Sequence, residues 1–294
     1  MNKQLRDDFK KYKQALIRRD FGRMNPMQFE AVTAVNGPLL VLAGAGSGKT
    51  TVLVSRIANI MKYGDAYNAE SSLVIEPEDV ALLKACLDGD KSLDAKAAGL
   101  ICERPVKGYQ ILAITFTNKA AGELKERIEN QVGEQARDIW ASTFHSACAR
   151  ILRRHAERIG YDSRFTIYDT DDSKRLMKEC LKELNIDEKT LPHRYVLSQI
   201  SRAKDRLLSP KAYAGEAGDD YRQQKVAAAY IQYERKLKQA GAMDFDDLIF
   251  NTVRLFREHK DVLEDYQNRF RYILVDEYQD TNHAQYMLVK LLAE

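Results

Sequence analysis

The stretch LLVLAGAGSGKTTVL occupies residues 39–53 and changes character twice. An apolar run gives way to four small residues, and Gly48, Lys49 and Thr50 follow. This order predicts a buried strand over residues 38–42, then a tight loop, then the start of a helix. A loop built in this way binds an anion.

The loop segment AGAGSGKT differs from the phosphate-loop consensus Gly-x-x-x-x-Gly-Lys-[Ser/Thr] only in its first residue, Ala43. Its glycines let successive N–H groups converge on a polyphosphate at a helix N-terminus. Lys49 is expected to reach the β and γ phosphates, and Thr50 to bind Mg²⁺. The alternative is a glycine-rich turn before a helix. The predicted nucleotide-binding residues are Ala43, Gly44, Ala45, Gly46, Ser47, Gly48, Lys49, Thr50 and Thr51.

A second motif, YILVDEYQD, covers residues 272–280 and ends an apolar run with two carboxylates. A metal-binding Asp sits at this place in loop-bearing NTPases, so Asp276 is predicted to hold Mg²⁺. Glu277 is then placed to orient and deprotonate an attacking water. The alternative is a solvated strand end. The predicted catalytic residues are therefore Lys49, Asp276 and Glu277.

The two motifs belong to a larger α/β pattern. Apolar runs at residues 38–42, 109–116, 138–144 and 272–276 are each followed by helical sequence, which is typical of a parallel sheet covered on both faces. The region between the last two runs predicts helices at residues 145–159, 170–185, 193–207, 219–240 and 245–257. It is expected to form a subdomain. Residues 64–108 are expected to be a surface insertion with a short helix.

Composition excludes some classes of protein. The chain has 294 residues, of which 45% are hydrophobic and 30% charged, as in soluble globular proteins. Residues 1–23 carry eight Lys or Arg against three Asp, so this tail is basic. It is expected to be a solvated helix, and the alternative is that it binds DNA or a partner. Four scattered cysteines predict reduced thiols of a cytoplasmic protein, with no zinc or redox pair. Nothing predicts secretion or a membrane span.

Six segments together resemble one family. In chain order they are NPMQFEAV, AGAGSGKT, AITFTNKAAGELKERI, STFHSACARILRR, DFDDLI and VDEYQDTNHAQY. They are similar to the UvrD/PcrA/Rep family of superfamily-one DNA helicases. The resemblance implies a P-loop NTPase fold with a RecA-like parallel sheet, formed by residues 1–165 and 246–294. It also implies an inserted all-helical subdomain at residues 166–245, and ATP and Mg²⁺ as cofactors.

The same resemblance assigns further site residues. Gln28 is expected to read adenine, Arg56 to lie near the nucleotide, and Gln279 to connect the nucleotide site to its neighbours. Phe116 is expected to stack on a base, which suits movement along any sequence, and a core position is the alternative. His145 is expected to contact the phosphate backbone, and a structural role is the alternative. No metal-binding role follows from Asp244, Asp246 and Asp247 in DFDDLI. The predicted DNA-binding residues are Thr115, Phe116, Thr117, Asn118, Lys119, Thr143, Phe144 and His145.

The resemblance implies an ATP-dependent helicase that moves 3′ to 5′ on single-stranded DNA and acts at DNA junctions, as a monomer, in DNA repair or replication. The later family motifs are absent from the 294 residues, so we expect this chain alone to be weakly active or inactive. Two alternatives stay open. One is a subunit of an AddA/RecB-type helicase-nuclease. The other is an ATP- and DNA-binding module without turnover.

Overall fold

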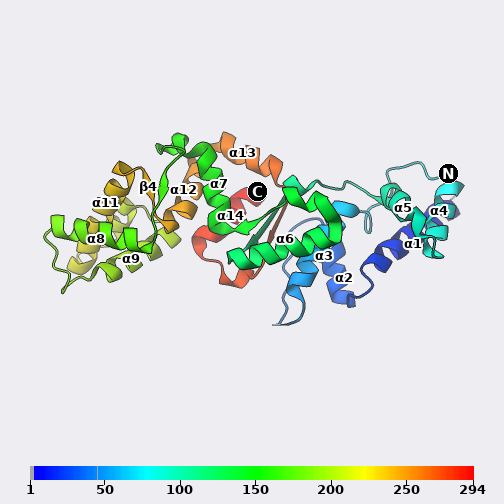
Figure 1. The fold of residues 1–294 in the computed structure, drawn as a ribbon, viewed down its shortest axis with the longest axis horizontal. Helices are drawn as coiled ribbons and strands as arrows, with labels where there is room; N and C mark the ends of the chain where they lie inside the picture. The colour runs from blue at the N-terminus through cyan, green and yellow to red at the C-terminus, as the bar shows by residue number, and fades with distance from the viewer. Residues whose placement is uncertain (1–2, 45) are drawn as a thin grey trace. The chain divides into compact units, whose positions relative to one another are not determined.

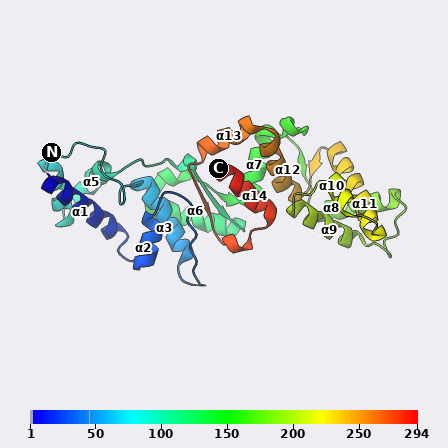
Figure 2. The same cartoon turned by 180° about the vertical axis from the view of Figure 1, so that it is seen from behind.

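The computed structural model describes residues 3–44 and 46–294 (Figures 1 and 2). The chain divides into two compact units. The first comprises Met1–Ala141 and Leu274–Asp276, and the second comprises Ser142–Ile273 and Glu277–Glu294. The loop of residues 43–50 and Asp276 therefore belong to the same unit.

The main sheet has three strands in the order β2-β1-β5. β1 (Ile111–Thr115) is buried at every position, as its uninterrupted apolar sequence requires. β2 (Trp140–Thr143) and β5 (Tyr272–Val275) flank it. Helix α6 (Asn118–Val132) connects β1 to its neighbour β2, as in parallel sheets, where a helical crossover is needed. Three of the four predicted strands and the α/β class are confirmed.

The fourth prediction, a buried strand at residues 38–42, is wrong. Leu39, Leu40, Val41 and Leu42 are 43%, 64%, 40% and 86% exposed. Among the described residues, no backbone hydrogen bond reaches this run. Hydrophobicity predicts burial but specifies no pairing partner, and a strand requires the backbone of a neighbour. Gly37, with φ of 75°, also turns the chain immediately before the run.

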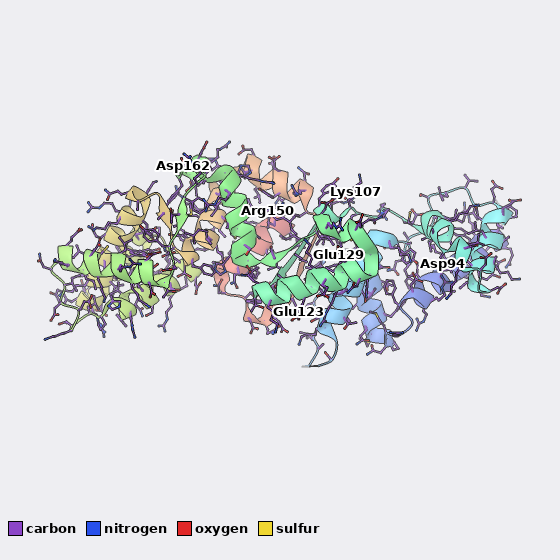
Figure 3. All side chains as sticks on the ribbon, in the orientation of Figure 1. Asp94, Lys107, Glu123, Glu129, Arg150 and Asp162 are labelled. Atoms are coloured by element: carbon purple, nitrogen blue, oxygen red, sulfur yellow. The ribbon has the colours of Figure 1, made fainter. Side chains whose placement is uncertain are left out.

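The N-terminal tail also differs from the predicted solvated helix, because one face of it packs against the insertion. Helix α1 (Lys3–Asp20) lies against α4 (Pro77–Leu87) of the insertion and shares a core with α5 (Asp94–Ile101). Phe9 and Leu16 of α1 are buried. Lys13 is buried too and donates to the Ala69 carbonyl at 2.7 Å. Arg19 ion-pairs at 2.6 Å with Asp94, which is labelled in Figure 3. The insertion therefore covers the tail, which is not a solvated helix.

Two further helices complete the first unit. α3 (Lys49–Lys62) starts at the glycine-rich loop, and both α2 (Pro26–Thr33) and α6 pack against it. Short 3-10 helices occur at Lys91–Leu93, Gly108–Gln110 and Gly133–Asp138.

The second unit is mainly helical, as predicted. Helices α8 (Thr170–Glu183), α9 (His193–Asp205) and α11 (Tyr221–Gln239) lie side by side (Figures 1 and 2). Their shared core includes Met177, Tyr230 and Tyr233. A short parallel pair joins Thr166 to Ala242 and brings the two ends of the predicted helical insertion together. The boundaries of an independent subdomain at residues 166–245 stay a prediction. The elements are α7 (Phe144–His155), β3 (Thr166–Ile167), α8 (Thr170–Glu183), α9 (His193–Asp205), α10 (Pro210–Glu216), α11 (Tyr221–Gln239), β4 (Ala242–Met243), α12 (Phe245–Glu258), α13 (Lys260–Arg269) and α14 (His283–Ala293), with 3-10 turns at Ala156–Ile159 and Tyr278–Asp280.

All four cysteines are free thiols, and Cys86, Cys148 and Cys180 are buried. Burial raises the pKa of Cys148 to about 12 and that of Cys180 to about 11. Both thiols are therefore neutral core residues. Among the helices of the described residues, none is long and apolar enough to cross a membrane.

Candidate nucleotide and DNA site

The glycine-rich loop has the backbone that a phosphate site needs. Gly48 is left-handed, with φ of 86° and ψ of 25°, and immediately precedes α3. Glycine provides no side-chain cap, so no capping side chain competes with an anion for the first-turn N–H groups. The Ser47 hydroxyl donates to the Gly44 carbonyl at 2.7 Å and tightens the loop. A Cβ added at Gly44 or Gly46 would meet nothing within 4 Å, so the loop borders open space. These features fit a bound polyphosphate. Ala45 lies outside the described residues.

Gln28 contacts this loop directly. It belongs to a capping box with Asn25, in which its Oε1 accepts from the Asn25 N–H at 3.1 Å. Its Nε2 donates to the Ser47 carbonyl at 3.0 Å. A Cβ on Gly48 would lie only 3.2 Å from that nitrogen, so glycine also allows this close approach. The amide is thus positioned beside the loop, and its role in reading adenine stays a prediction.

The other predicted nucleotide residues surround the start of α3. Lys49 and Thr50 are half-buried and Thr51 is exposed. The Lys49 ammonium donates to the Ala43 carbonyl at 3.3 Å, so it folds back over the loop. Arg56 donates to the carbonyls of Ala31 and Ala34 at the C-terminal end of α2, where a cation complements the helix dipole. A structural role for Arg56 is therefore present, whereas its predicted nucleotide role stays a prediction.

The acidic doublet follows β5 directly. The Asp276 N–H donates to the Ile114 carbonyl at 2.9 Å and continues the pairing with β1. Glu277 has φ of 51° and ψ of 44°, a left-handed conformation that costs a residue with a side chain about 1–3 kcal/mol. Such strain is concentrated at functional sites. Gln279 donates to the Glu277 carboxylate and so orients it.

The first predicted DNA segment divides into buried and exposed residues. Phe116 is 36% exposed, and the side chain of Lys119 is 88% exposed. The Lys119 ammonium lies 4.0 Å from Glu123, which Figure 3 labels on α6. Thr117 caps α6 through the Ala120 N–H. Thr115 is buried, and its hydroxyl donates to the Thr117 carbonyl at 3.2 Å. The exposed residues from Phe116 to Lys119 can meet a ligand, whereas the Thr115 side chain faces inwards.

The second segment has the same division. Thr143 caps α7 and Phe144 is 1% exposed, so both serve the fold. His145 is half-buried and stacks on Phe245, with ring centroids 3.8 Å apart. Phe245 is 56% exposed and was not among the predicted residues. An aromatic residue between acidic neighbours in DFDDLI was the available signal. Burial lowers the pKa of His145 to about 4, so the ring is neutral at physiological pH.

This low pKa predicts a pH effect on stability. The unfolded chain protonates His145 near its ordinary pKa of about 6.5, whereas the folded chain does so near 4. Between these values the unfolded state binds more protons, so stability falls as the pH drops. We expect His145→Gln to lose less thermal stability than the wild type between pH 7 and 5. If the melting temperatures of the two proteins changed in parallel with pH, a lowered pKa of His145 in the folded state would be contradicted.

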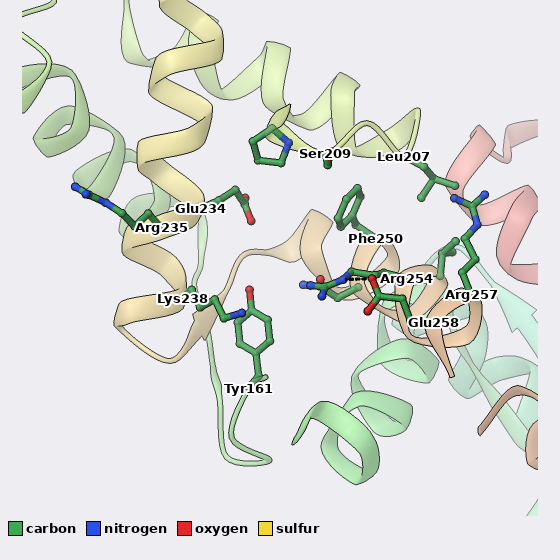
Figure 4. Close-up of a pocket in the computed structure, with 13 residues that line it drawn as sticks. Tyr161, Leu207, Ser209, Glu234, Arg235, Lys238, Phe250, Arg254, Arg257 and Glu258 are labelled. Atoms are coloured by element: carbon green, nitrogen blue, oxygen red, sulfur yellow. Dashed lines mark hydrogen bonds and ion pairs between the residues drawn. The ribbon is translucent and has the colours of Figure 1, made fainter. Parts of the chain in front are cut away.

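A cavity of about 500 Å³ lies elsewhere, in the second unit (Figure 4). Tyr161, Phe250 and Leu207 line it together with Arg254, which hydrogen-bonds to Glu258 at 2.8 Å. None of the predicted ATP- or DNA-binding residues lines this cavity. The predicted site residues therefore lie outside this cavity.

Comparison with known proteins agrees with this geometry. The sequence matches the family described as UvrD/REP helicase N-terminal domain over residues 24–75 and 91–294. It is 47% identical over 270 residues to the ATP-dependent DNA helicase PcrA of Staphylococcus aureus strain Mu50, and equally to the PcrA of Staphylococcus epidermidis strain RP62A. These alignments cover 92% of this chain and 31% of each relative, so the chain spans about a third of their length.

The family model leaves residues 1–23, which include α1, and residues 76–90 of the insertion unmatched. All of the segments that carry the loop, the acidic doublet and the exposed aromatic residues lie inside the match. The chain belongs to the UvrD/REP helicase family and contains its N-terminal domain.

Proposed function

We propose that this chain is the N-terminal part of an ATP-dependent DNA helicase that moves 3′ to 5′ along single-stranded DNA. The observation that carries the proposal is the uncapped N-terminus of α3 behind a left-handed glycine, in the same unit as Asp276. Family membership and the names of the relatives support the same activity.

In this proposal the N–H groups at the start of α3 and the Lys49 ammonium bind the β and γ phosphates of ATP. Thr50 and Asp276 hold Mg²⁺, which when bound offsets the charge of the phosphate oxygens. Glu277, held by Gln279, accepts the proton of the attacking water. Gln28 selects adenine from its position beside Ser47.

DNA binding is proposed for the exposed residues of the two segments. Phe116 and the stacked pair of His145 and Phe245 offer ring faces to bases, and stacking tolerates any sequence. Lys119 faces solvent, where it can contact phosphates. His145 is neutral at physiological pH, so we assign it to stacking and hydrogen bonding and not to charge pairing.

We further propose that the complete protein acts in the bacterial cytoplasm as a monomer, at DNA junctions, in repair or replication. An AddA/RecB-type helicase-nuclease subunit is the second candidate. Our reason for preferring the first is the 47% identity to PcrA helicases over 92% of the chain.

The proposal is tested by ATP turnover with and without single-stranded DNA, for residues 1–294 and for the complete gene product. We expect DNA-stimulated hydrolysis and unwinding from the complete protein only. An arginine that stabilises the transferred phosphoryl group contributes about 10³–10⁵ in rate, and such an arginine is expected outside residues 1–294. Vigorous DNA-stimulated ATP turnover by residues 1–294 alone would contradict the expectation that only the complete protein is active. A complete protein that binds ATP and DNA without hydrolysis would favour the binding module.

A further inference from the structure

A buried lysine joins three helices of the second unit. Lys204 of α9 is 1% exposed, and its ammonium lies 2.8 Å from Glu234 of α11, 2.8 Å from Asp244 and 2.7 Å from Asp247. Burial alone would lower the pKa of Lys204, but the three carboxylates raise it well above its ordinary value. The ammonium thus occupies the place that a metal ion would take in this acidic cluster.

Two of these carboxylates also start α12. Asp244 accepts from the Asp247 N–H at 2.9 Å, and Asp247 accepts from the Asp244 N–H at 3.0 Å, which is a reciprocal capping box. Phe245 lies between them in the chain and stacks on His145. Lys204 therefore fixes the turn of α12 that carries the proposed DNA-stacking ring.

The next residue of α9 makes the second connection. Asp205 accepts from the Asn282 Nδ2 at 2.6 Å. The Oδ1 of the same Asn282 accepts from the Gln285 N–H at 2.8 Å and caps α14. The side chain at position 282 thus has to donate one hydrogen bond and accept another, and an amide can do both. It lies five residues after Glu277, and Gln279 contacts Glu277 on the way.

We propose that Asp205 and Asn282 are positioning residues that couple DNA on the His145–Phe245 pair to ATP hydrolysis at Glu277. The inference rests on the proposed function. The contacts run from Phe245 through the first turn of α12 to Lys204 and Asp205, and from there through Asn282 to the segment of Glu277. All of these residues belong to the second unit.

Three variants of the complete protein test this coupling. Asn282→Asp keeps the cap acceptor but sets a carboxylate against Asp205. Asp205→Asn keeps an acceptor for Asn282, so it leaves the contact in place. The double variant restores the contact with donor and acceptor exchanged. Because a hydrogen bond to a charged group supports roughly a tenfold effect, we expect Asn282→Asp to lower DNA-stimulated kcat about 10-fold with little change in the KM for ATP.

The double variant should recover kcat to within about threefold of the wild type. Asp220→Asn, at the exposed cap of α11, is the matched control and should leave stimulation unchanged. If Asn282→Asp does not fold, Asn282→Ser removes the donor and keeps a cap. Normal stimulation in folded Asn282→Asp or Asn282→Ser, or no rescue in the double variant, would overturn the coupling. A wild type without DNA-stimulated hydrolysis would instead overturn the proposed function and the coupling with it.

Discussion

Replacing Glu277 with Gln in the complete protein is expected to lower kcat for ATP hydrolysis by roughly 10²–10⁴-fold, the usual contribution of a positioned general base. The amide is the same size as the carboxylate and still accepts the hydrogen bond that Gln279 donates. It cannot take a proton from water. Nucleotide affinity should therefore stay near that of the wild type, because we assign the phosphate contacts to the loop and to Lys49 and not to Glu277.

Lys49→Ala is the matched comparison, since it removes the cation expected at the β and γ phosphates. This variant should lose nucleotide affinity as well as turnover. The two variants are separated by titrating a fluorescent ADP analogue and by measuring steady-state hydrolysis with saturating single-stranded DNA. A Glu277→Gln protein that hydrolyses ATP at the wild-type rate would show that another group activates the water.

The left-handed conformation of Glu277 could not be predicted from the sequence. The motif indicated a carboxylate after an apolar strand, and the structure adds a backbone strain that turns the chain between Asp276 and Glu277. The first residue continues the pairing with β1, whereas the second enters the turn of Tyr278–Asp280. Residue type is readable from a sequence, but the direction of a side chain at a turn depends on neighbouring elements.

Local patterns predicted local structure well. Helices α7, α8, α9, α11 and α12 lie close to their predicted limits because their apolar spacing and caps are encoded within the helix, as in Asp169 and Asp244. The short helix α10 was not predicted. The prediction of a strand at residues 38–42 was wrong because strand pairing depends on residues that are distant in the sequence. The prediction of a solvated N-terminal tail was wrong because the charge of the tail was given more weight than the helical spacing of Phe9 and Leu16. The burial of these two residues depends on the insertion, which is distant in the sequence.

Site residues divide in the same way. The left-handed glycine before α3 depends on short spacing and was readable, whereas the inward direction of Thr115 and Phe144 was not. Lys204 gave no signal at all, because its three carboxylates lie 30 or more residues further along the chain. Contacts of that kind require the packed fold.

Lys204→Met is expected to destabilise the protein by about 3–5 kcal/mol, because it leaves buried carboxylates without their cation. Methionine fills a similar volume, so lost packing contributes little. The loss should shrink as the pH falls from 8 towards 5. Burial and the neighbouring Asp244 already raise the pKa of Asp247, and without the ammonium the folded state binds protons there that the unfolded state does not.

Lys236→Met on α11 is the matched control, because Lys236 also pairs with two carboxylates, Glu179 and Glu183, that are exposed. Exposed pairs contribute little to stability, so this variant should unfold close to the wild type. Urea unfolding followed by circular dichroism at both pH values measures the difference. Adding Asp247→Asn to Lys204→Met should recover part of the loss, because one buried charge is removed. Equal destabilisation by the two lysine variants would mean that the buried cluster is not held together by its charge.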